Sequence, residues 1–255
     1  MKVDPYLVAQ NYLDTWNPAG RLVPNTEVHL DEALCREIAD WYDRAPMCTG
    51  DVSEERQYQC FKKETLHQFI TLLEAGIRIE PWSGGGQPYP DSRTLQQRVR
   101  ETGRLNVYMT RDGHGCGGVG SRAANHPMIE PSPITIGGTV FLYNDLFRAV
   151  HDYFGHIVRG NRFSIRGEFM ASRDHLQMYT PDCHNVLLAE TIGQISWFYH
   201  GPHLRAADGR IPQRGEPGYL PPSKRPYSPQ KTAPLPEEFV SAFNAQFMST
   251  LFSRI

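Results

Sequence analysis

The stretch Phe147-Arg-Ala-Val-His151-Asp-Tyr-Phe-Gly-His156 carries two histidines on a segment that we predict to be helical. Asp152 and His156 are four residues apart and share one face of a regular α-helix. His151 and His156 are five residues apart and diverge by about 140° around such a helix. Both imidazoles therefore reach one metal ion only near a helix end or a distortion, and Gly155 favours a distortion because it has no side chain.

Two further predicted helices follow this stretch and carry polar residues at helical spacing. Glu168 and His175 are seven residues apart, about two turns, so they point the same way from the first of these helices. Glu190, Gln194 and Trp197 are spaced four and three residues apart and share a face of the second. Burying so many polar groups is costly without partners, and one metal ion would satisfy several of them together.

The residue types favour iron(II) as this metal. Two histidines and one carboxylate leave coordination positions open, which is the facial arrangement of non-haem iron(II) oxygenases. We expect His151, His156 and Glu190 to bind the metal. We expect catalytic roles beside the metal for Glu168, His175 and Gln194. If two metal ions bind, Glu168 and His175 would be ligands of the second. Zinc accepts the same ligands in hydrolases, so the residue types alone leave zinc open.

Three other residues are candidates for binding a substrate. Arg122 and Arg148 are expected to anchor a carboxylate, because a guanidinium group matches a carboxylate with two parallel hydrogen bonds. Trp197 is expected to stack on an aromatic substrate. These residues point to a small substrate that is aromatic or resembles an amino acid.

The segment His151-Asp-Tyr-Phe-Gly-His156 resembles the iron-binding segment, HDxFGH, of the pterin-dependent aromatic amino acid hydroxylases. The resemblance implies that His151 and His156 are iron ligands. In that family the third ligand is a Glu beside a Trp-aromatic pair. Here Trp197-Phe198 is followed by Tyr199, so Glu190 is the nearest substitute, and pterin use does not follow from a match this short.

A longer resemblance connects the chain with uncharacterised, often phage-encoded proteins that also contain HDYFGH. It rests on four parts of the sequence: Tyr143 to His156, Gly167-Glu168, Glu190 to Gln194 and Gln230-Lys231. This likeness implies no particular activity.

The pattern of the whole chain predicts a mainly α fold, a single-domain helical bundle over residues 1–255 with a small β element. The first predicted helix begins near Asp31, and the last begins near Pro236. Between them, helices are predicted over about 53–75, 92–102, 145–157, 164–178 and 184–200. A strand is expected over 105–110, and a hairpin over 134–141 turns at Gly137-Gly138. Eight of the 20 prolines lie in residues 212–236, which predicts an extended strap.

Composition limits the partners and the compartment. The net charge of −2 offers no basic field for nucleic acid, and no segment approaches the roughly 20 apolar residues of a membrane-spanning helix. The five cysteines are an odd number without a CxxC pair, so we expect a reducing, cytoplasmic setting. Six of the ten histidines lie within residues 151–203, which is where chemistry is expected.

These features predict a non-haem iron-dependent oxygenase that oxidises a small substrate with O2. Three alternatives stay open at this point. A helical bundle also suits a di-iron oxygenase, with a second metal ion bound. Zinc with Glu168 as general base would give a hydrolase, and a metal-free polar cluster would give a non-catalytic binding module. Neither nucleic acid nor a membrane is an expected partner.

Overall fold

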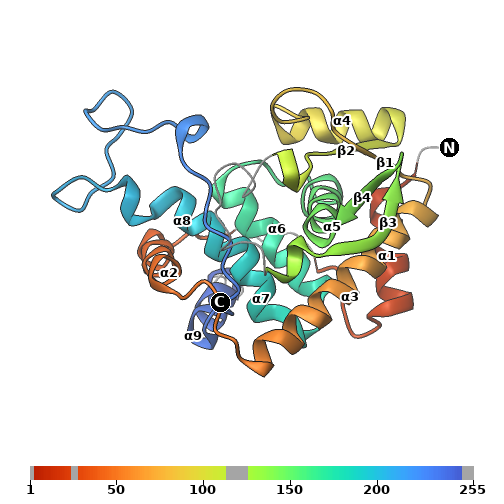
Figure 1. Cartoon of the computed structure of the whole chain (residues 1–255), viewed down its shortest axis with the longest axis horizontal. Helices are drawn as coiled ribbons and strands as arrows, with labels where there is room; N and C mark the ends of the chain where they lie inside the picture. Colours follow the sequence, from red (N-terminus) through yellow and green to blue (C-terminus); the bar gives the residue numbers. More distant parts are fainter. Residues whose placement is uncertain (1–2, 24–27, 113–125, 249–255) are drawn as a thin grey trace, which may run out of the picture.

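The computed structural model describes residues 3–23, 28–112 and 126–248, and in them the fold is mainly α-helical, as predicted (Figure 1). The helices are α1 (Pro5–Trp16), α2 (Glu32–Arg44), α3 (Val52–Glu74), α4 (Ser92–Thr102), α5 (Tyr143–Val150), α6 (Ile165–Met178), α7 (His184–Leu188), α8 (Gln194–His200) and α9 (Glu237–Met248). The strands are β1 (Arg78–Pro81), β2 (Arg104–Val107), β3 (Pro131–Ile136) and β4 (Thr139–Leu142).

Side-chain caps explain where several of these helices begin. The carboxylate of Asp31 accepts hydrogen bonds from the first backbone N–H groups of α2, and Asp91 does the same for α4. Ser164 accepts from the N–H of Gly167 at the start of α6. Because each cap satisfies a backbone donor that the helix leaves unpaired, it fixes the first turn in place. The predicted helix starts at Asp31 and Ser92 are confirmed.

The strands form two small sheets that lie at the edge of the helices (Figure 1). β3 and β4 pair antiparallel around Gly137 and Gly138, whose φ angles of 57° and 77° only glycine adopts readily, so the predicted hairpin is confirmed. β2 is shorter than the predicted strand over 105–110. It pairs in parallel with β1, which the sequence analysis missed, and α4 makes the connection between them.

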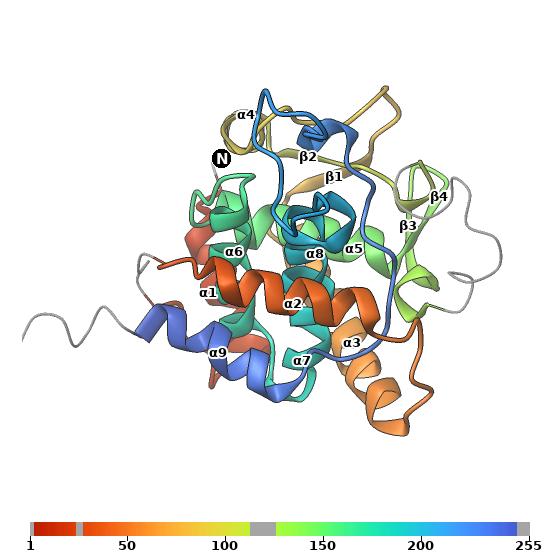
Figure 2. The same ribbon diagram turned by 90° about the vertical axis from the view of Figure 1, so that its left-hand side faces the viewer.

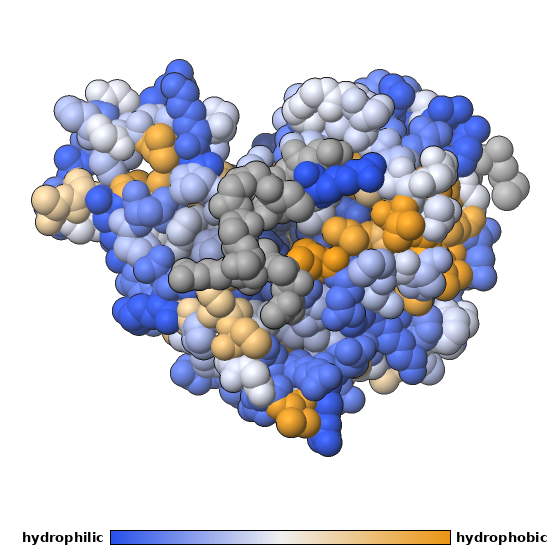
Figure 3. Space-filling view, viewed as in Figure 1, coloured by the Kyte–Doolittle hydropathy of each residue, from blue (hydrophilic) through white to orange (hydrophobic). Residues whose placement is uncertain are grey.

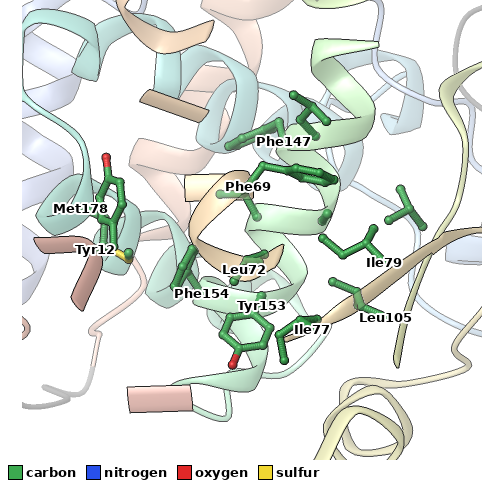
Figure 4. Packing of buried hydrophobic residues seen from close by; sticks show 14 of the residues in the cluster. Tyr12, Phe69, Leu72, Ile77, Ile79, Leu105, Phe147, Tyr153, Phe154 and Met178 are labelled. Atoms are coloured by element: carbon green, nitrogen blue, oxygen red, sulfur yellow. The ribbon is translucent and has the colours of Figure 1, made fainter. Parts of the chain in front are cut away.

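Two apolar clusters hold the helices together. The larger one joins α1, α3, β1, β2 and α5 to the segment that follows α5. Figure 4 shows Phe154 and Tyr153 of that segment near Leu72 of α3 and Ile77, the residue before β1. The second cluster joins α2, α6, α9 and the segment between α7 and α8. Burying aromatic and aliphatic side chains in this way supplies most of the stability of such a fold.

Two helical stretches widen into π-helices. One covers His151–Ile157 and continues directly from α5, and the other covers Ala189–Gly193 and joins α7 to α8. A π-helix closes its backbone hydrogen bonds between residues i and i+5 and is common at functional sites. The distortion predicted around Gly155 is therefore present, and it contains both histidines of the HDYFGH segment.

The proline-rich segment after α8 runs past α8 and α2 to the start of α9 (Figure 2). Its end is fixed by hydrogen bonds from Lys231 Nζ to the backbone oxygen of Asp43, 2.7 Å, and from Thr232 N to that of Met47, 3.0 Å. Between α8 and α9 the segment forms two short 3-10 turns, Pro202–Leu204 and Pro222–Lys224, because its prolines disfavour longer helices.

Within the described ranges, every helix is too short or too polar to span a lipid bilayer.

Candidate metal centre

Three side-chain atoms of kinds that bind metal ions face one another around the first π-helix. His151 Nε2 lies 3.0 Å from His156 Nε2 and 3.1 Å from Glu168 Oε2, and His156 Nε2 lies 3.6 Å from the same oxygen. Ligand atoms about 2.1 Å from a metal are separated by roughly 3.0 Å at right angles and roughly 3.4 Å in a tetrahedron. The three observed separations match those of atoms that share one ion.

The π-helix explains how two histidines five residues apart come together. Because its hydrogen bonds join i to i+5, His151 and His156 lie on the same side instead of diverging as in an α-helix. Gly155 allows α6 to approach this side. A Cβ atom on Gly155 would lie 3.0 Å from Ala171 Cβ and 3.3 Å from His175 Nε2, tighter than normal contact.

His156 is held in the orientation that a metal ligand needs. Its Nδ1 lies 3.0 Å from the backbone oxygen of Asn161, which assigns the proton to Nδ1 and leaves Nε2 with a free lone pair. Asn161 is fixed in turn, because its Nδ2 donates to the Gly155 oxygen at 2.8 Å and to Asp174 at 2.9 Å. The imidazole is 1% exposed, so water does not compete for its ring nitrogens.

His151 is oriented by His175. His151 Nδ1 and His175 Nε2 are 3.1 Å apart, and the two rings are stacked with an interplanar angle of 21°. When His151 Nε2 serves as a ligand, its Nδ1 carries the proton and donates to His175. Burial and the neighbouring His151 lower the pKa of His175 well below its usual value, so His175 is neutral and able to accept. His175 Nδ1 has no hydrogen-bond partner within the described residues.

Glu168 supplies a negative charge to the cluster. Burial by itself would raise the pKa of this carboxyl group, but the neighbouring imidazoles of His156 and His151 hold the pKa well below its usual range. Burial opposes charge on His156 as well, yet Glu168 raises the pKa of that imidazole. The cluster is thus anionic at Glu168, which suits a divalent cation.

Glu190 lies elsewhere, and the expectation that it completes the ligand set is corrected. Tyr58 OH donates to its Oε1 at 2.6 Å, and Gln194 Nε2 donates to its Oε2 at 2.8 Å. His126 Nε2 lies 3.1 Å from Oε1, while His126 Nδ1 accepts from the backbone N–H of Met128. Glu190 lies in the π-helix Ala189–Gly193, and its carboxylate contacts Tyr58 of α3, Gln194 of α8 and His126. It does not belong to the group formed by His151, His156 and Glu168.

A pocket of about 370 Å³ adjoins the cluster and is lined by His151, Glu168, Glu190 and Gln194. Figure 3 shows the surface notched between the side that carries the loop after α8 and the side that carries α4. The lining includes the loop before α4 and the strap, at residues 87–89 and 227–230. Six aromatic residues contribute to it: Tyr89, Tyr108, Phe147, Phe163, Phe198 and Tyr227.

The three predicted substrate-binding residues have different positions. Arg148 lines the pocket, and its Nη1 donates to the backbone oxygen of Tyr108 at 2.7 Å. Trp197 does not belong to the lining. Its indole N–H donates to Asp43 at 2.8 Å, and its ring stacks on His203 with centroids 3.8 Å apart, so its expected role in the pocket is corrected. Arg122 lies outside the described residues.

Sequence reasoning missed two groups that shape the site. Asn161 orients His156 through a backbone oxygen, an atom that every residue has, so no sequence signal marks this role. His126 and Tyr58 lie far from Glu190 in the chain, and their contact with it depends on how α3 packs. A single histidine and a single tyrosine in unrelated segments give no pattern to find.

Neither family models, curated proteins nor solved structures yield a match to this chain. The likeness of residues 151–156 to the hydroxylase segment stays a local resemblance. Any assignment of function therefore depends on the geometry and chemistry of the site.

Proposed function

We propose that the protein is a mononuclear non-haem iron(II) oxygenase with His151, His156 and Glu168 as its metal ligands. The observation that carries the proposal is the triangle of two imidazole nitrogens and one carboxylate oxygen, with sides of 3.0, 3.1 and 3.6 Å. His151 and Glu168 also line the pocket, so an ion held there would be accessible to a substrate and to O2.

The donor set fits iron(II). Two neutral imidazoles and one carboxylate on one side of an ion are the facial triad of oxygen-using iron enzymes, and they leave the opposite positions free. Among the described residues, neither Glu190 nor His175 belongs to a second group of three ligands near the pocket. This supports one ion and not the two of a di-iron oxygenase.

When bound, iron(II) would supply the redox chemistry that activates dioxygen, and the oxidised substrate would supply the net electrons. Residues of the chain would orient the metal ligands and surround the substrate. Asn161 and His175 hold the two imidazoles in their ligating orientations through hydrogen bonds to the ring nitrogens that face away from the ion. A substrate that fills the aromatic pocket would displace water from the reacting groups, which would strengthen electrostatic interactions there.

The pocket favours a small aromatic or amino acid-like substrate. Its volume of about 370 Å³ lies at the small end of the range for ligand sites, and aromatic rings are prominent in its wall. Arg148 places a guanidinium group in the wall for a substrate carboxylate.

Oxygen uptake tests the proposal. Protein loaded with iron(II) without air is mixed with oxygenated buffer and a panel of aromatic carboxylic acids and amino acids. We expect iron-dependent O2 consumption with some of them, abolished in His156→Ala and unchanged in His29→Ala, which removes an exposed histidine away from the pocket. The proposal is contradicted if iron-loaded protein consumes no O2 with any of these compounds. Hydrolytic turnover by the zinc-loaded protein would then favour a hydrolase.

A further inference from the structure

A second group of metal-binding side chains lies outside the pocket. It consists of Cys60, Glu64 and Cys183, whose two sulfur atoms and one carboxylate oxygen all lie within 4.8 Å of one another. None of the three belongs to the pocket lining. The cluster therefore needs an explanation separate from the iron proposal.

Two elements, α3 and the 3-10 turn before α7, bring these residues together. Cys60 and Glu64 are one turn apart on α3, and the Cys60 thiol donates to Glu64 Oε1 at 3.2 Å. Cys183 ends the 3-10 turn Pro181–Cys183 that precedes α7, and this turn packs on α3. The Cys183 thiol lies 3.5 Å from the backbone oxygen of Thr180, which also belongs to the connection between α6 and α7.

Thr180 holds the carboxylate of Glu64 in place with two hydrogen bonds. Its backbone N–H donates to Oε2 at 2.9 Å, and its hydroxyl donates to Oε1 at 2.5 Å. Hydrogen bonds of this kind orient a carboxylate ligand around a metal and set its direction before the ion arrives. Both bonds come from a residue 116 positions away in the chain, and they tie α3 to the connection between α6 and α7.

We propose that Cys60, Cys183 and Glu64 bind a thiophilic divalent cation, Zn²⁺, with solvent at the fourth position. In tetrahedral zinc sites the metal lies about 2.3 Å from sulfur and about 2.0 Å from carboxylate oxygen. Neighbouring ligands are then roughly 3.8 Å apart for two sulfurs and roughly 3.5 Å apart for sulfur and oxygen. The observed sulfur-to-oxygen contact of 3.2 Å is within a few tenths of an ångström of that separation.

Access and ligand type agree with this assignment. Cys183 is wholly buried, whereas Cys60 and Glu64 are partly exposed, so an ion enters from solvent on the side of α3. Soft thiolates select zinc over magnesium or calcium, and they release their protons when the ion binds. The bound ion would tie α3 to the α6–α7 connection.

Cadmium titration tests the site, because Cd²⁺ bound by thiolates gives a charge-transfer absorption band. Reduced, metal-free full-length protein is titrated without air. We expect a band that saturates at one equivalent, is lost in Cys60→Ser and is kept in Cys48→Ser, whose exposed thiol lies outside the cluster. Glu64→Gln should keep the band with affinity weakened by about 10-fold or more.

Thermal unfolding gives a second readout that needs no activity. Zn²⁺ should raise the Tm of the His151→Ala/His156→Ala double variant, and adding Cys60→Ser to that variant should abolish the rise. The double variant separates this site from the iron proposal, because it lacks the histidine ligands and keeps the thiols. No cadmium band in the wild type, or a full band in Cys60→Ser, would overturn the proposal, as would a Cys60–Cys183 disulfide in protein isolated without air.

Discussion

Glu168 and Glu190 both line the pocket, but their neighbours give them different roles. Glu168 faces two imidazole nitrogens, whereas Glu190 accepts hydrogen bonds from Tyr58 and Gln194. We expect Glu168→Ala to weaken iron(II) binding by about 100-fold or more, because a ligand is lost. Glu190→Ala should keep the metal within about 10-fold and cost roughly 1 to 3 kcal/mol of stability, because buried donors lose their acceptor.

Iron(II) affinity of the two variants, measured by anaerobic titration, and their free energy of unfolding in urea check this prediction together. The free energy of unfolding shows whether a variant loses iron because a ligand is missing or because the protein is no longer folded. The ligand assignment fails when Glu190→Ala releases the metal and Glu168→Ala retains it.

Asp174 is a residue whose charge state links stability to pH. Burial raises the pKa of its carboxyl group to about 6, above roughly 3.9 in the unfolded chain. The folded state therefore binds more protons than the unfolded state between these values, and stability falls as the pH rises through them. Relative to Asp174→Asn, the metal-free wild type should lose about 2 to 3 kcal/mol between about pH 4 and pH 7.

Urea unfolding of both proteins across this pH range measures the difference, because all other titrating groups are common to the two. Asn is a suitable replacement, since its side-chain oxygen still accepts from Asn161. A difference that stays constant with pH would show that Asp174 does not titrate in this range.

At the scale of elements, the π-helix His151–Ile157 places the two histidines of the motif on the same side of the chain. Gly155→Ala should disturb it, because the new methyl group would lie 3.0 Å from Ala171 Cβ and 3.3 Å from His175 Nε2. We expect a loss of about 1 to 3 kcal/mol in the free energy of unfolding. Iron(II) affinity should also fall, since His175 orients His151.

Gly85→Ala is the matched control, because a Cβ at Gly85 meets nothing within 4 Å. It should leave stability within about 0.5 kcal/mol and metal affinity unchanged. Equal stability and equal iron affinity in the two alanine variants would mean that α6 does not press on the π-helix as described.

Local signals explain which elements the sequence predicts well. The helix starts at Asp31 and Ser92 follow from a capping side chain and a periodic apolar face, both of which are encoded within a few residues. The hairpin at Gly137-Gly138 is equally local. β1 escaped prediction because its four residues are stabilised by parallel pairing with β2, a contact across α4 that no local pattern encodes.

At the scale of the whole molecule, the site depends on segments that are far apart in the chain. His151 and His156 are predictable because one motif contains both. The choice of carboxylate is not, because it depends on how α6 and the π-helix Ala189–Gly193 pack against the π-helix that carries the two histidines. Helical spacing in the sequence cannot predict which of Glu168 and Glu190 reaches the two histidines, since both residues lie on helices that follow the motif.

The pocket is likewise a property of the assembled molecule. Its wall combines the loop at 87–89, the π-helix, α6, α8 and the strap at 227–230. The strap is held in place by contacts such as Lys231 Nζ with the backbone oxygens of Asp43 and Ala45, both 2.7 Å. Loops and straps lack the periodicity that predicts position, so the aromatic lining could not be derived from the sequence.

The iron content of the purified chain tests the central claim most directly. Protein is reconstituted with iron(II) without air, freed of loosely bound metal and subjected to elemental analysis beside the His151→Ala/His156→Ala double variant. We predict about one iron per chain in the wild type and none in the double variant, because its two imidazole ligands are deleted. No retained iron in the wild type, or equal iron in both proteins, would contradict the proposed metal centre.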